Sequence, residues 1–172
     1  MKLLPPSACQ PQAATVFASV AQELAALLPH AQVEHIGASA IPGAVSKGDL
    51  DICVLVAPHT HQSAVDTLLA AGYTPKADTL RTPALCMLLS PRTELDVALQ
   101  VVARGSEFES FFLHFRDALR ADPLLVAQYN QLKQQFADSG EERYRAEKSR
   151  FIAAVLNATA ASAAATPPPA PG

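Results

Sequence analysis

The sequence lacks the features of membrane, disulfide-stabilised and zinc-binding proteins. It contains no apolar run of the roughly 18 residues that a membrane-spanning helix needs, so no membrane segment is expected. Cysteine is scarce: Cys9, Cys53 and Cys86 have no short spacing, which argues against a disulfide framework or a zinc site. Cys53 and Cys86 lie in apolar runs, as buried thiols of a reducing compartment do. Prolines interrupt the N-terminal segment, which does not resemble a secretory signal, so the sequence predicts a cytoplasmic protein.

Charged residues are also scarce, and acidic residues slightly outnumber basic ones. The chain of 172 residues is 17% charged and 49% hydrophobic, and its net charge is −3. This composition excludes a disordered chain and supplies enough apolar surface for one domain with a substantial core. An acidic chain is a poor candidate for contacts along a nucleic-acid backbone, although a local basic pocket for a small anion is compatible with it. We therefore expect a small-molecule partner and no nucleic-acid partner.

Hydrophobic periodicity predicts a mixed α/β segment followed by a helical C-terminal third. Residues 1–11 are predicted to be an N-terminal extension, residues 12–156 the folded domain, and residues 157–172 a disordered tail rich in alanine and proline. Helices are predicted over residues 12–28, 62–71, 107–121, 123–137 and 141–156, and strands over residues 32–36, 50–56, 84–89 and 95–102. The predicted fold class is α+β, close to α/β, with a mixed β-sheet flanked by helices.

Two aspartates, Asp49 and Asp51, stand at the start of the apolar run of residues 50–56. Side chains alternate along a strand, so these two face the same side, with Cα atoms roughly 6.5–7 Å apart. Carboxylates held this close repel one another unless one is protonated or a cation neutralises them. Mg²⁺ (or Mn²⁺) is a suitable cation, because it binds one or two carboxylates together with substrate phosphates. The alternative is a loop aspartate followed by a strand-end charge that faces water.

A turn containing Gly37 and Ser39 follows the predicted strand 32–36. Glycine lets backbone N–H groups approach a phosphate closely, and a serine hydroxyl adds a neutral donor. Lys47, between this turn and the two aspartates, has the charge to meet a phosphate, although a solvated loop lysine fits nearly as well. The segment is neither a Walker A sequence nor a GxGxxG fingerprint, so an ordinary turn is the alternative to a phosphate-binding loop.

A third carboxylate, Asp96, lies at the start of the predicted strand 95–102. Three carboxylates on two neighbouring strands are able to hold two metal ions across a triphosphate. The alternative is an aspartate at a strand end that faces solvent.

Two aromatic–lysine pairs with i,i+4 spacing lie on the predicted C-terminal helices. They are Tyr129 with Lys133 and Tyr144 with Lys148. An aromatic ring beside a cation suits a nucleotide base and its phosphates. The same spacing is typical of an amphipathic helix on which the lysine stem covers the ring.

The order of these motifs resembles the GrpB family of the nucleotidyltransferase superfamily. The resemblance rests on residues 35–43, on Lys47 and on Asp51-Ile52, and it continues through weaker similarities to span residues 12–156. It implies a nucleotidyltransferase fold and Mg²⁺-dependent chemistry on a nucleoside triphosphate. The implied catalytic and metal-binding residues are Asp49, Asp51 and Asp96, and the implied nucleotide and phosphate contacts are Gly37, Ser39, Lys47, Tyr144 and Lys148.

Two departures from the family pattern leave the activity open. Ala38 stands where the family usually has serine, and residues 97–100 lack two histidines common in the family. These departures favour a non-catalytic nucleotide- or metabolite-binding module of the same fold. The complete pair Asp49 and Asp51 favours a nucleotidyltransferase that acts on an unidentified small-molecule acceptor. A third possibility is a protein-interaction domain whose helical third is the contact surface.

Overall fold

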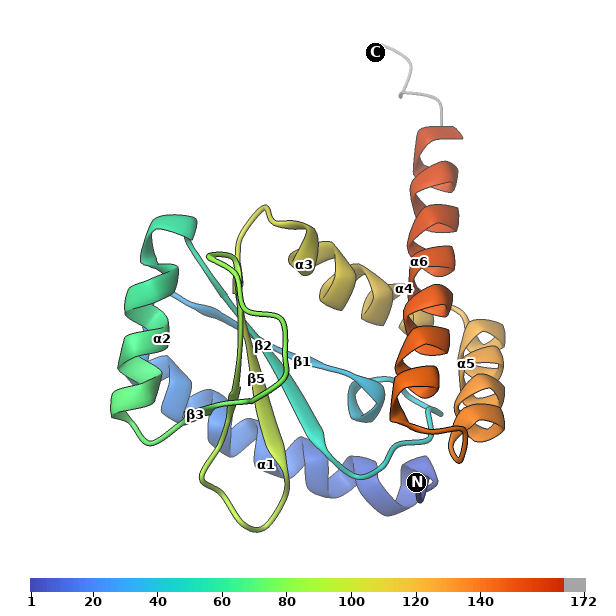
Figure 1. Cartoon of the computed structure of the whole chain (residues 1–172), viewed down its shortest axis with the longest axis horizontal. Coiled ribbons are helices and arrows are strands. Elements are labelled where there is room, and N and C mark those ends of the chain that lie inside the picture. Colours follow the sequence, from blue (N-terminus) through green and yellow to red (C-terminus); the bar gives the residue numbers. More distant parts are fainter. Residues whose placement is uncertain (166–172) are drawn as a thin grey trace, which may run out of the picture.

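The protein is built on a mixed β-sheet, seen in a computed structural model that describes residues 1–165 (Figure 1). The sheet has five strands in the order β1-β2-β5-β4-β3. The central strands β2 and β5 are parallel, and the other pairs are antiparallel. The strands are β1 (Gln32–Ile36), β2 (Leu50–Val56), β3 (Thr74–Pro75), β4 (Leu85–Leu89) and β5 (Val97–Ala103). The α+β class, the mixed sheet and all four predicted strands are confirmed; the two-residue β3 is additional.

Helices cover both faces of this sheet. The helices are α1 (Pro6–Leu27), α2 (His61–Ala70), α3 (Glu107–Glu109), α4 (Phe115–Ala121), α5 (Pro123–Phe136) and α6 (Glu141–Ala165), with single 3-10 turns at η1 (Ala38–Ala40) and η2 (Pro58–Thr60). A π-helical turn, Ser110–His114, joins α3 to α4, so the predicted helix over residues 107–121 is continuous but irregular. The helical C-terminal third is confirmed. None of the described helices is long and apolar enough to cross a membrane.

Strand β2 is buried on both faces, and its alternating side chains pack into a different cluster on each face of the sheet. Its even-numbered residues, Leu50, Ile52, Val54 and Val56, pack into the core that α1 and α2 form with the sheet. On the opposite face, Cys53 and Leu55 pack against Ile36 and against Phe108 and Phe112 of the C-terminal segment. Asp51 is on this second face, because side chains alternate along the strand. The helical third therefore lies over the face from which Asp51 projects.

Helix α1 begins at Pro6, so part of the predicted N-terminal extension is helical. Pro6 occupies the first turn, where the missing N–H costs nothing, and Pro11 removes one hydrogen bond inside the helix. Burial favours the longer helix, because Cys9 and Ala13 continue the buried stripe of Val16 and Val20. The predicted start of this helix, at residue 12, is therefore too late.

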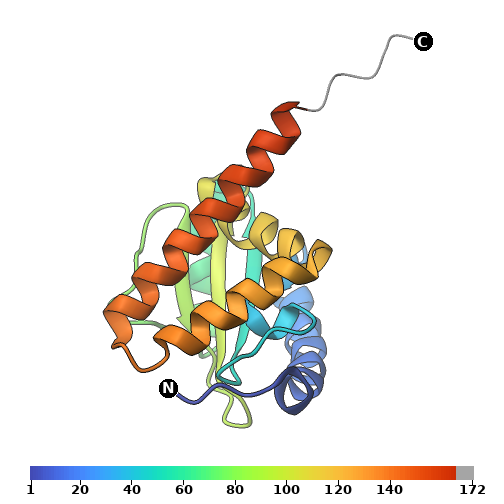
Figure 2. The same ribbon diagram turned by 90° about the vertical axis from the view of Figure 1, so that its right-hand side faces the viewer.

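Helix α6 is longer than predicted, because it continues through Asn157 to Ala165. Alanine has the highest helix propensity, and an alanine-rich segment continues a helix that packing has already nucleated. The end of α6 projects beyond the sheet (Figures 1 and 2). The predicted disordered tail is thus wrong for residues 157–165, and its remainder, 166–172, lies outside the described residues.

Candidate functional site

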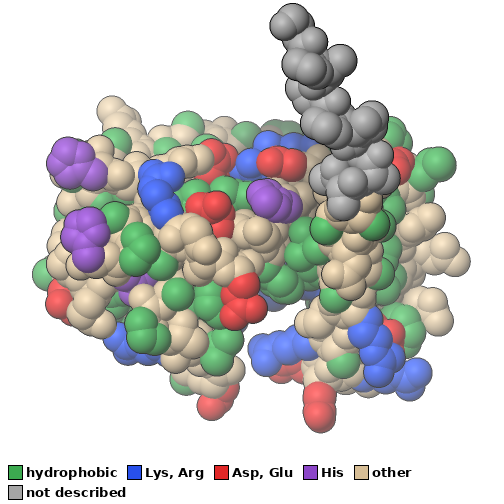
Figure 3. Space-filling model, turned by 90° about the horizontal axis from the view of Figure 1, so that it is seen from above, with side chains coloured by type: hydrophobic (Ala, Val, Ile, Leu, Met, Phe, Trp, Pro, Cys, Tyr) green, Lys and Arg blue, Asp and Glu red, His purple; other side chains and the backbone are tan. Residues whose placement is uncertain are grey.

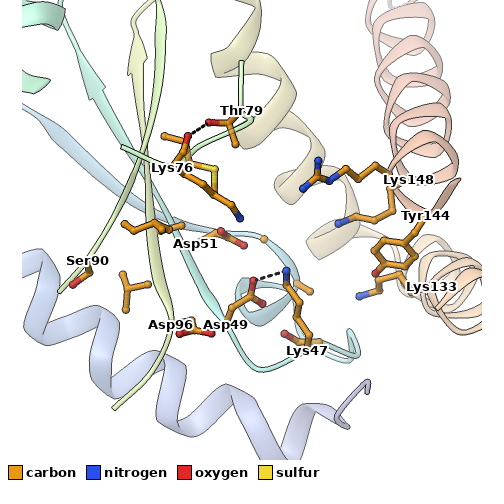
Figure 4. Close-up of a pocket in the computed structure, with 18 of the residues that line it drawn as sticks. Lys47, Asp49, Asp51, Lys76, Thr79, Ser90, Asp96, Lys133, Tyr144 and Lys148 are labelled. Atoms are coloured by element: carbon orange, nitrogen blue, oxygen red, sulfur yellow. Dashed lines mark hydrogen bonds and ion pairs between the residues drawn. The ribbon is translucent and has the colours of Figure 1, made fainter. Parts of the chain in front are cut away.

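A large cavity lies between one end of the sheet and the last two helices. Its volume is about 640 Å³, and it is lined by the starts of β2 and β5, by the turn after β1 and by side chains of α5 and α6. Figure 4 shows aspartates on the sheet side and lysines and a tyrosine on the helix side, facing one another. The sheet pairing explains the location: Ile36 at the end of β1 and Ala98 at the start of β5 both pair with Asp51.

The three predicted carboxylates all line this cavity. Asp49 immediately precedes β2, Asp51 is its second residue, and Asp96 immediately precedes β5. The backbone N–H of Leu50 donates to the carbonyl of Asp96 over 2.9 Å, which joins the two strand starts. Among residues 1–165, however, no three His, Cys, Asp or Glu side chains are grouped closely enough to hold a metal ion. The expected three-carboxylate cluster is therefore not assembled as a metal site, although Asp96 lies at the cavity, exposed, immediately before β5.

The carboxylate of Asp51 has a strongly shifted pKa. Burial, and secondly the neighbouring charge of Asp49, raise the pKa of Asp51 to about 6. Three lysines act in the opposite direction: Lys148, Lys47 and Lys76. The ammonium of Lys47 is paired with Asp49, with 3.4 Å between Nζ and Oδ2. Lys47 thus lies at the cavity, where it is paired with a carboxylate, and its contact with a phosphate stays a prediction.

Two carboxylates in this setting fit a hard divalent cation. Asp49 and Asp51 both offer oxygen donors to the cavity, and a bound cation would offset the burial and the charge repulsion that raise the pKa of Asp51. Mg²⁺ prefers one or two protein carboxylates, with its remaining positions left to water and phosphate oxygens. The residues that would hold Mg²⁺ or Mn²⁺ are therefore Asp49 and Asp51, with Asp96 on the same wall before the neighbouring strand β5.

Gly37 packs tightly against the side chain of Asp51. Its backbone has φ +74°, a conformation that residues with a side chain rarely adopt. A Cβ at this position would lie 2.8 Å from Oδ2 of Asp51, which is too close for any real contact. Glycine at this position therefore lets the turn pass directly beside the Asp51 carboxylate.

Ser39 departs from its predicted role at the phosphate turn. Its side chain is buried, and its hydroxyl is 2.9 Å from Nε2 of His35. The ring of His35 stacks on Phe17 at 5.0 Å between ring centroids, and burial lowers the pKa of His35 to about 4. The cavity is lined instead by Gly37 and Ala38, which have no hydroxyl. Sequence could not reveal this, because it gave no orientation for the one-turn helix η1.

The helix side of the cavity brings both aromatic–lysine pairs together. Tyr129 and Lys133 of α5 and Tyr144 and Lys148 of α6 all line it. The Lys148 ammonium lies 5.2 Å from the centroid of the Tyr144 ring, and that of Lys133 lies 4.3 Å from the Tyr129 ring. Each lysine therefore covers its own tyrosine, as in an amphipathic helix, and also faces the cavity. This geometry agrees with the amphipathic-helix interpretation, and contact of these pairs with a nucleotide base and its phosphates stays a prediction.

Three further cations line the cavity that sequence reasoning did not single out. They are Lys76, which follows β3, Arg92 in the β4–β5 turn, and Arg145 on α6. Arg92 is already paired with Glu23 and Glu94, so its charge is compensated. Figure 4 shows Lys76 extending toward Asp51. Each is an isolated basic residue in the sequence, so no motif marked it.

Lys133 is the most deeply buried charged group of the site. It is 2% exposed, and its ammonium donates to the backbone carbonyl of Val45. Burial, and secondly the nearby charge of Lys148, lower the pKa of Lys133 to about 7, against opposing effects of Asp49 and Cys9. A lysine that lines a cavity and holds its proton weakly can become fully charged when an anion binds.

We expect Lys133→Met to stabilise the free protein at neutral and lower pH. Because the folded protein holds this proton less tightly than the unfolded chain, the burial cost is largest below about pH 7. It fades as the pH rises toward 10.5, the ordinary lysine value. Once the lost hydrogen bond to Val45 is subtracted, the net gain in the free energy of unfolding should be about 1–2 kcal/mol near pH 6 and close to zero near pH 10. Urea unfolding at both pH values measures it, with Lys2→Met on the exposed N-terminal segment as control. A pH-independent difference would contradict the buried charge.

Comparison with known sequences matches the chain to one family profile. The profile described as "GrpB protein" matches residues 7–158. A UPF0157 protein of Vibrio cholerae is 57% identical over 134 residues, which is 78% of this chain and 70% of that protein. A UPF0157 protein of Deinococcus radiodurans is 31% identical over 137 residues, which is 78% of this chain and 71% of that protein.

Comparison with solved structures identifies the fold. The crystal structure of GrpB from Enterococcus faecalis matches with a TM-score of 0.72 at 21% identity, over 92% of this chain and 99% of that one. The Cid1 poly(U) polymerase with MgGTP bound matches with a TM-score of 0.51 at 14% identity, over 74% of this chain and 42% of that one. At these identities the likeness concerns the fold alone, and the fold is that of the nucleotidyltransferases.

Proposed function

The chain belongs to the GrpB family, and we propose that it is a divalent-metal-dependent nucleotidyltransferase that acts on a small-molecule acceptor. The observation that carries the proposal is the arrangement of one cavity: Asp49 and Asp51 project from the sheet toward the cations Lys133 and Lys148 on the helices. A metal-bound nucleoside triphosphate carries positive charge on one side and phosphate oxygens on the other. It therefore complements both walls at once.

Each wall has a separate task in this proposal. Asp49 and Asp51 hold Mg²⁺ or Mn²⁺, which when bound neutralises the phosphate oxygens and makes the α-phosphate easier to attack. The backbone of Gly37 and Ala38 approaches the phosphates, and Lys148 pairs with their charge opposite the carboxylates. Tyr144 offers a ring face for the base. Positioning and charge neutralisation then do most of the work that such a transfer requires.

Asp96 has the position of a group that acts on the acceptor. It is exposed at the cavity wall, and its carboxylate has no ion-pair partner among the described residues. A carboxylate there is able to accept the proton that the acceptor hydroxyl or amine loses on attacking the α-phosphate.

The buried free thiols of Cys53 and Cys86 agree with the cytoplasmic setting expected from the sequence.

A non-catalytic nucleotide-binding module is the second candidate function. The absence of a close three-carboxylate group among residues 1–165 favours it, as does Ala38 in place of a serine. A thermal-shift screen of the four nucleoside triphosphates, with and without Mg²⁺, tests what the two candidates share. Stabilisation that needs both the nucleotide and the metal is the expected result, and none with any triphosphate would overturn both.

The variant Asp96→Asn separates the enzyme from the binding module. A group that acts mainly in the transition state can be removed with little loss of ground-state affinity. We expect Mg²⁺–triphosphate affinity to change only a few-fold, whereas transfer falls by about 10²-fold or more. The assay follows α-labelled nucleotide and pyrophosphate release in the presence of a small-molecule extract. Nucleotide binding without transfer by the wild type would favour the module, and transfer that survives in Asp96→Asn would remove this residue from the site.

A further inference from the structure

A second cavity lies at the far end of β2 from the carboxylates. Its volume is about 400 Å³, and it is lined by the end of α1, the end of β2, the start of α2 and Arg104 beyond β5. Asp51 and Val56 are five positions apart on β2, so about 17 Å of strand separates the two cavities. We propose that this second cavity binds a small organic anion that combines an apolar body with a carboxylate.

The floor of the second cavity is apolar. Val56 and Ala64 are among its lining residues and are themselves core residues, 5% and 4% exposed. Leu28 lines it as well and packs against the same core. A ligand with an apolar body gains free energy by covering such a surface, whereas a triphosphate does not. This floor distinguishes the second cavity from the charged cavity at the other end of the strand.

The rim of the second cavity carries donors and no carboxylate. Arg104, His30 and His59 lie on it, and none of the described residues that line it is an aspartate or a glutamate. Among residues 1–165, the guanidinium of Arg104 donates only to the neutral amide oxygen of Gln32, over 2.9 Å, and no carboxylate there is paired with it. Arg92 and Arg116, in contrast, are each paired with glutamates. Because this rim has basic side chains and no carboxylate, we expect it to favour an anion, although the protein as a whole is acidic.

The start of α2 adds a further preference for negative charge. Helix α2 is 10 residues long, and its N-cap residue, Thr60, makes no side-chain cap hydrogen bond. The hydroxyl of Thr60 donates instead to the carbonyl of Ala57, over 3.0 Å. The first N–H groups of a helix carry partial positive charge and attract anions. Thr60 and Ser63 line the cavity, so an anion at the rim lies near these groups.

Size and charge together define the ligand class. A cavity of about 400 Å³ is in the range of small-molecule sites and too small for a macromolecule. One guanidinium can pair with a carboxylate through two parallel hydrogen bonds, which fixes the orientation of the ligand. The apolar body then lies on Val56 and Leu28. Figure 3 shows histidine side chains at the left end of the molecule, close to a basic one, with apolar surface among them.

Hexanoate titrated into the full chain tests this proposal, with hexanol and hexylamine as neutral and cationic probes. Amide-resolved NMR is expected to show hexanoate shifts that are largest over residues 56–64, with an affinity at least about tenfold above that of the other probes. Arg104→Gln should lower hexanoate affinity about tenfold and leave hexanol affinity unchanged. Arg143→Gln, on an arginine that lies over Phe136, is the matched control and should change neither.

Several results would overturn the proposal. They are equal binding of hexanol and hexanoate, an unchanged hexanoate affinity in Arg104→Gln, shifts confined to other regions, and no shift up to about 20 mM. Asp51→Asn should leave hexanoate binding intact, because Asp51 lies in the other cavity. The second site and the proposed transferase function can therefore fail independently.

Discussion

Asp51→Asn should make the metal-free protein more stable and abolish its response to Mg²⁺. In the wild type, burial and the charge of Asp49 raise the pKa of Asp51 to about 6, above its ordinary 3.8. The folded protein therefore holds this proton more tightly than the unfolded chain, and wild-type stability falls as the pH rises from about 4 through 6. Asparagine removes that cost, so a gain of about 2 kcal/mol is expected near pH 7 without metal.

The variant Asp51→Asn should not be stabilised by Mg²⁺. Mg²⁺ that binds only the folded protein stabilises the wild type by about 2.7 kcal/mol at about a hundredfold excess over its dissociation constant. The variant should show no such gain, and its transfer activity should fall by about 10³-fold or more. Denaturant unfolding with and without Mg²⁺ at two pH values measures all of these stability changes.

Asp66→Asn provides the matched control for this experiment. Asp66 is an exposed carboxylate on α2 that accepts one hydrogen bond from Gln62, over 2.9 Å. Its replacement should leave the Mg²⁺ response and the transfer activity unchanged. A normal Mg²⁺ response in Asp51→Asn would contradict the metal site, and a loss in both variants would point to a nonspecific effect of charge.

The central strands and the sheet side of the site were predictable because their signals are local. The apolar run of β2 indicates a strand buried on both faces, and Asp49 and Asp51 stand at its start. The start of β5 carries Asp96 in the same way. Sequence does not state that these two strands are parallel neighbours. That pairing, which joins Leu50 to the carbonyl of Asp96, brings the three aspartates to one cavity.

The helix side of the site was less predictable because it depends on tertiary packing. Lys76 and Arg145 are unremarkable basic residues until the β3–β4 segment and α6 are placed around the cavity. The burial of Lys133 depends on a backbone carbonyl 88 residues away in the chain, that of Val45. Ser39 was misplaced for the opposite reason. Its motif was visible, but the rotation of η1 toward His35 was not.

Gly37→Ala should disable the site through one added methyl group. The backbone at Gly37, with φ +74° and ψ −176°, is in a region that is almost exclusive to glycine, so alanine costs about 1–3 kcal/mol of stability. The new Cβ would also lie 2.8 Å from Oδ2 and 3.2 Å from Cβ of Asp51. Both contacts are shorter than ordinary van der Waals contact, so the Asp51 carboxylate or the turn must move.

The variant Gly105→Ala distinguishes backbone strain at a positive φ from the steric clash with Asp51. Gly105 also has a positive φ, +79°, but a Cβ there would meet nothing within 4 Å. Its alanine variant should lose stability without losing the response to Mg²⁺ and nucleotide, whereas Gly37→Ala should lose both, with transfer reduced by about 10²-fold or more. Ser39→Ala, which removes only the bond to His35, should cost about 0.5–1.5 kcal/mol and leave nucleotide affinity nearly unchanged. Equal nucleotide binding in Gly37→Ala and Gly105→Ala would show that the turn does not position Asp51, and the phosphate would then have to be held by the helix side alone.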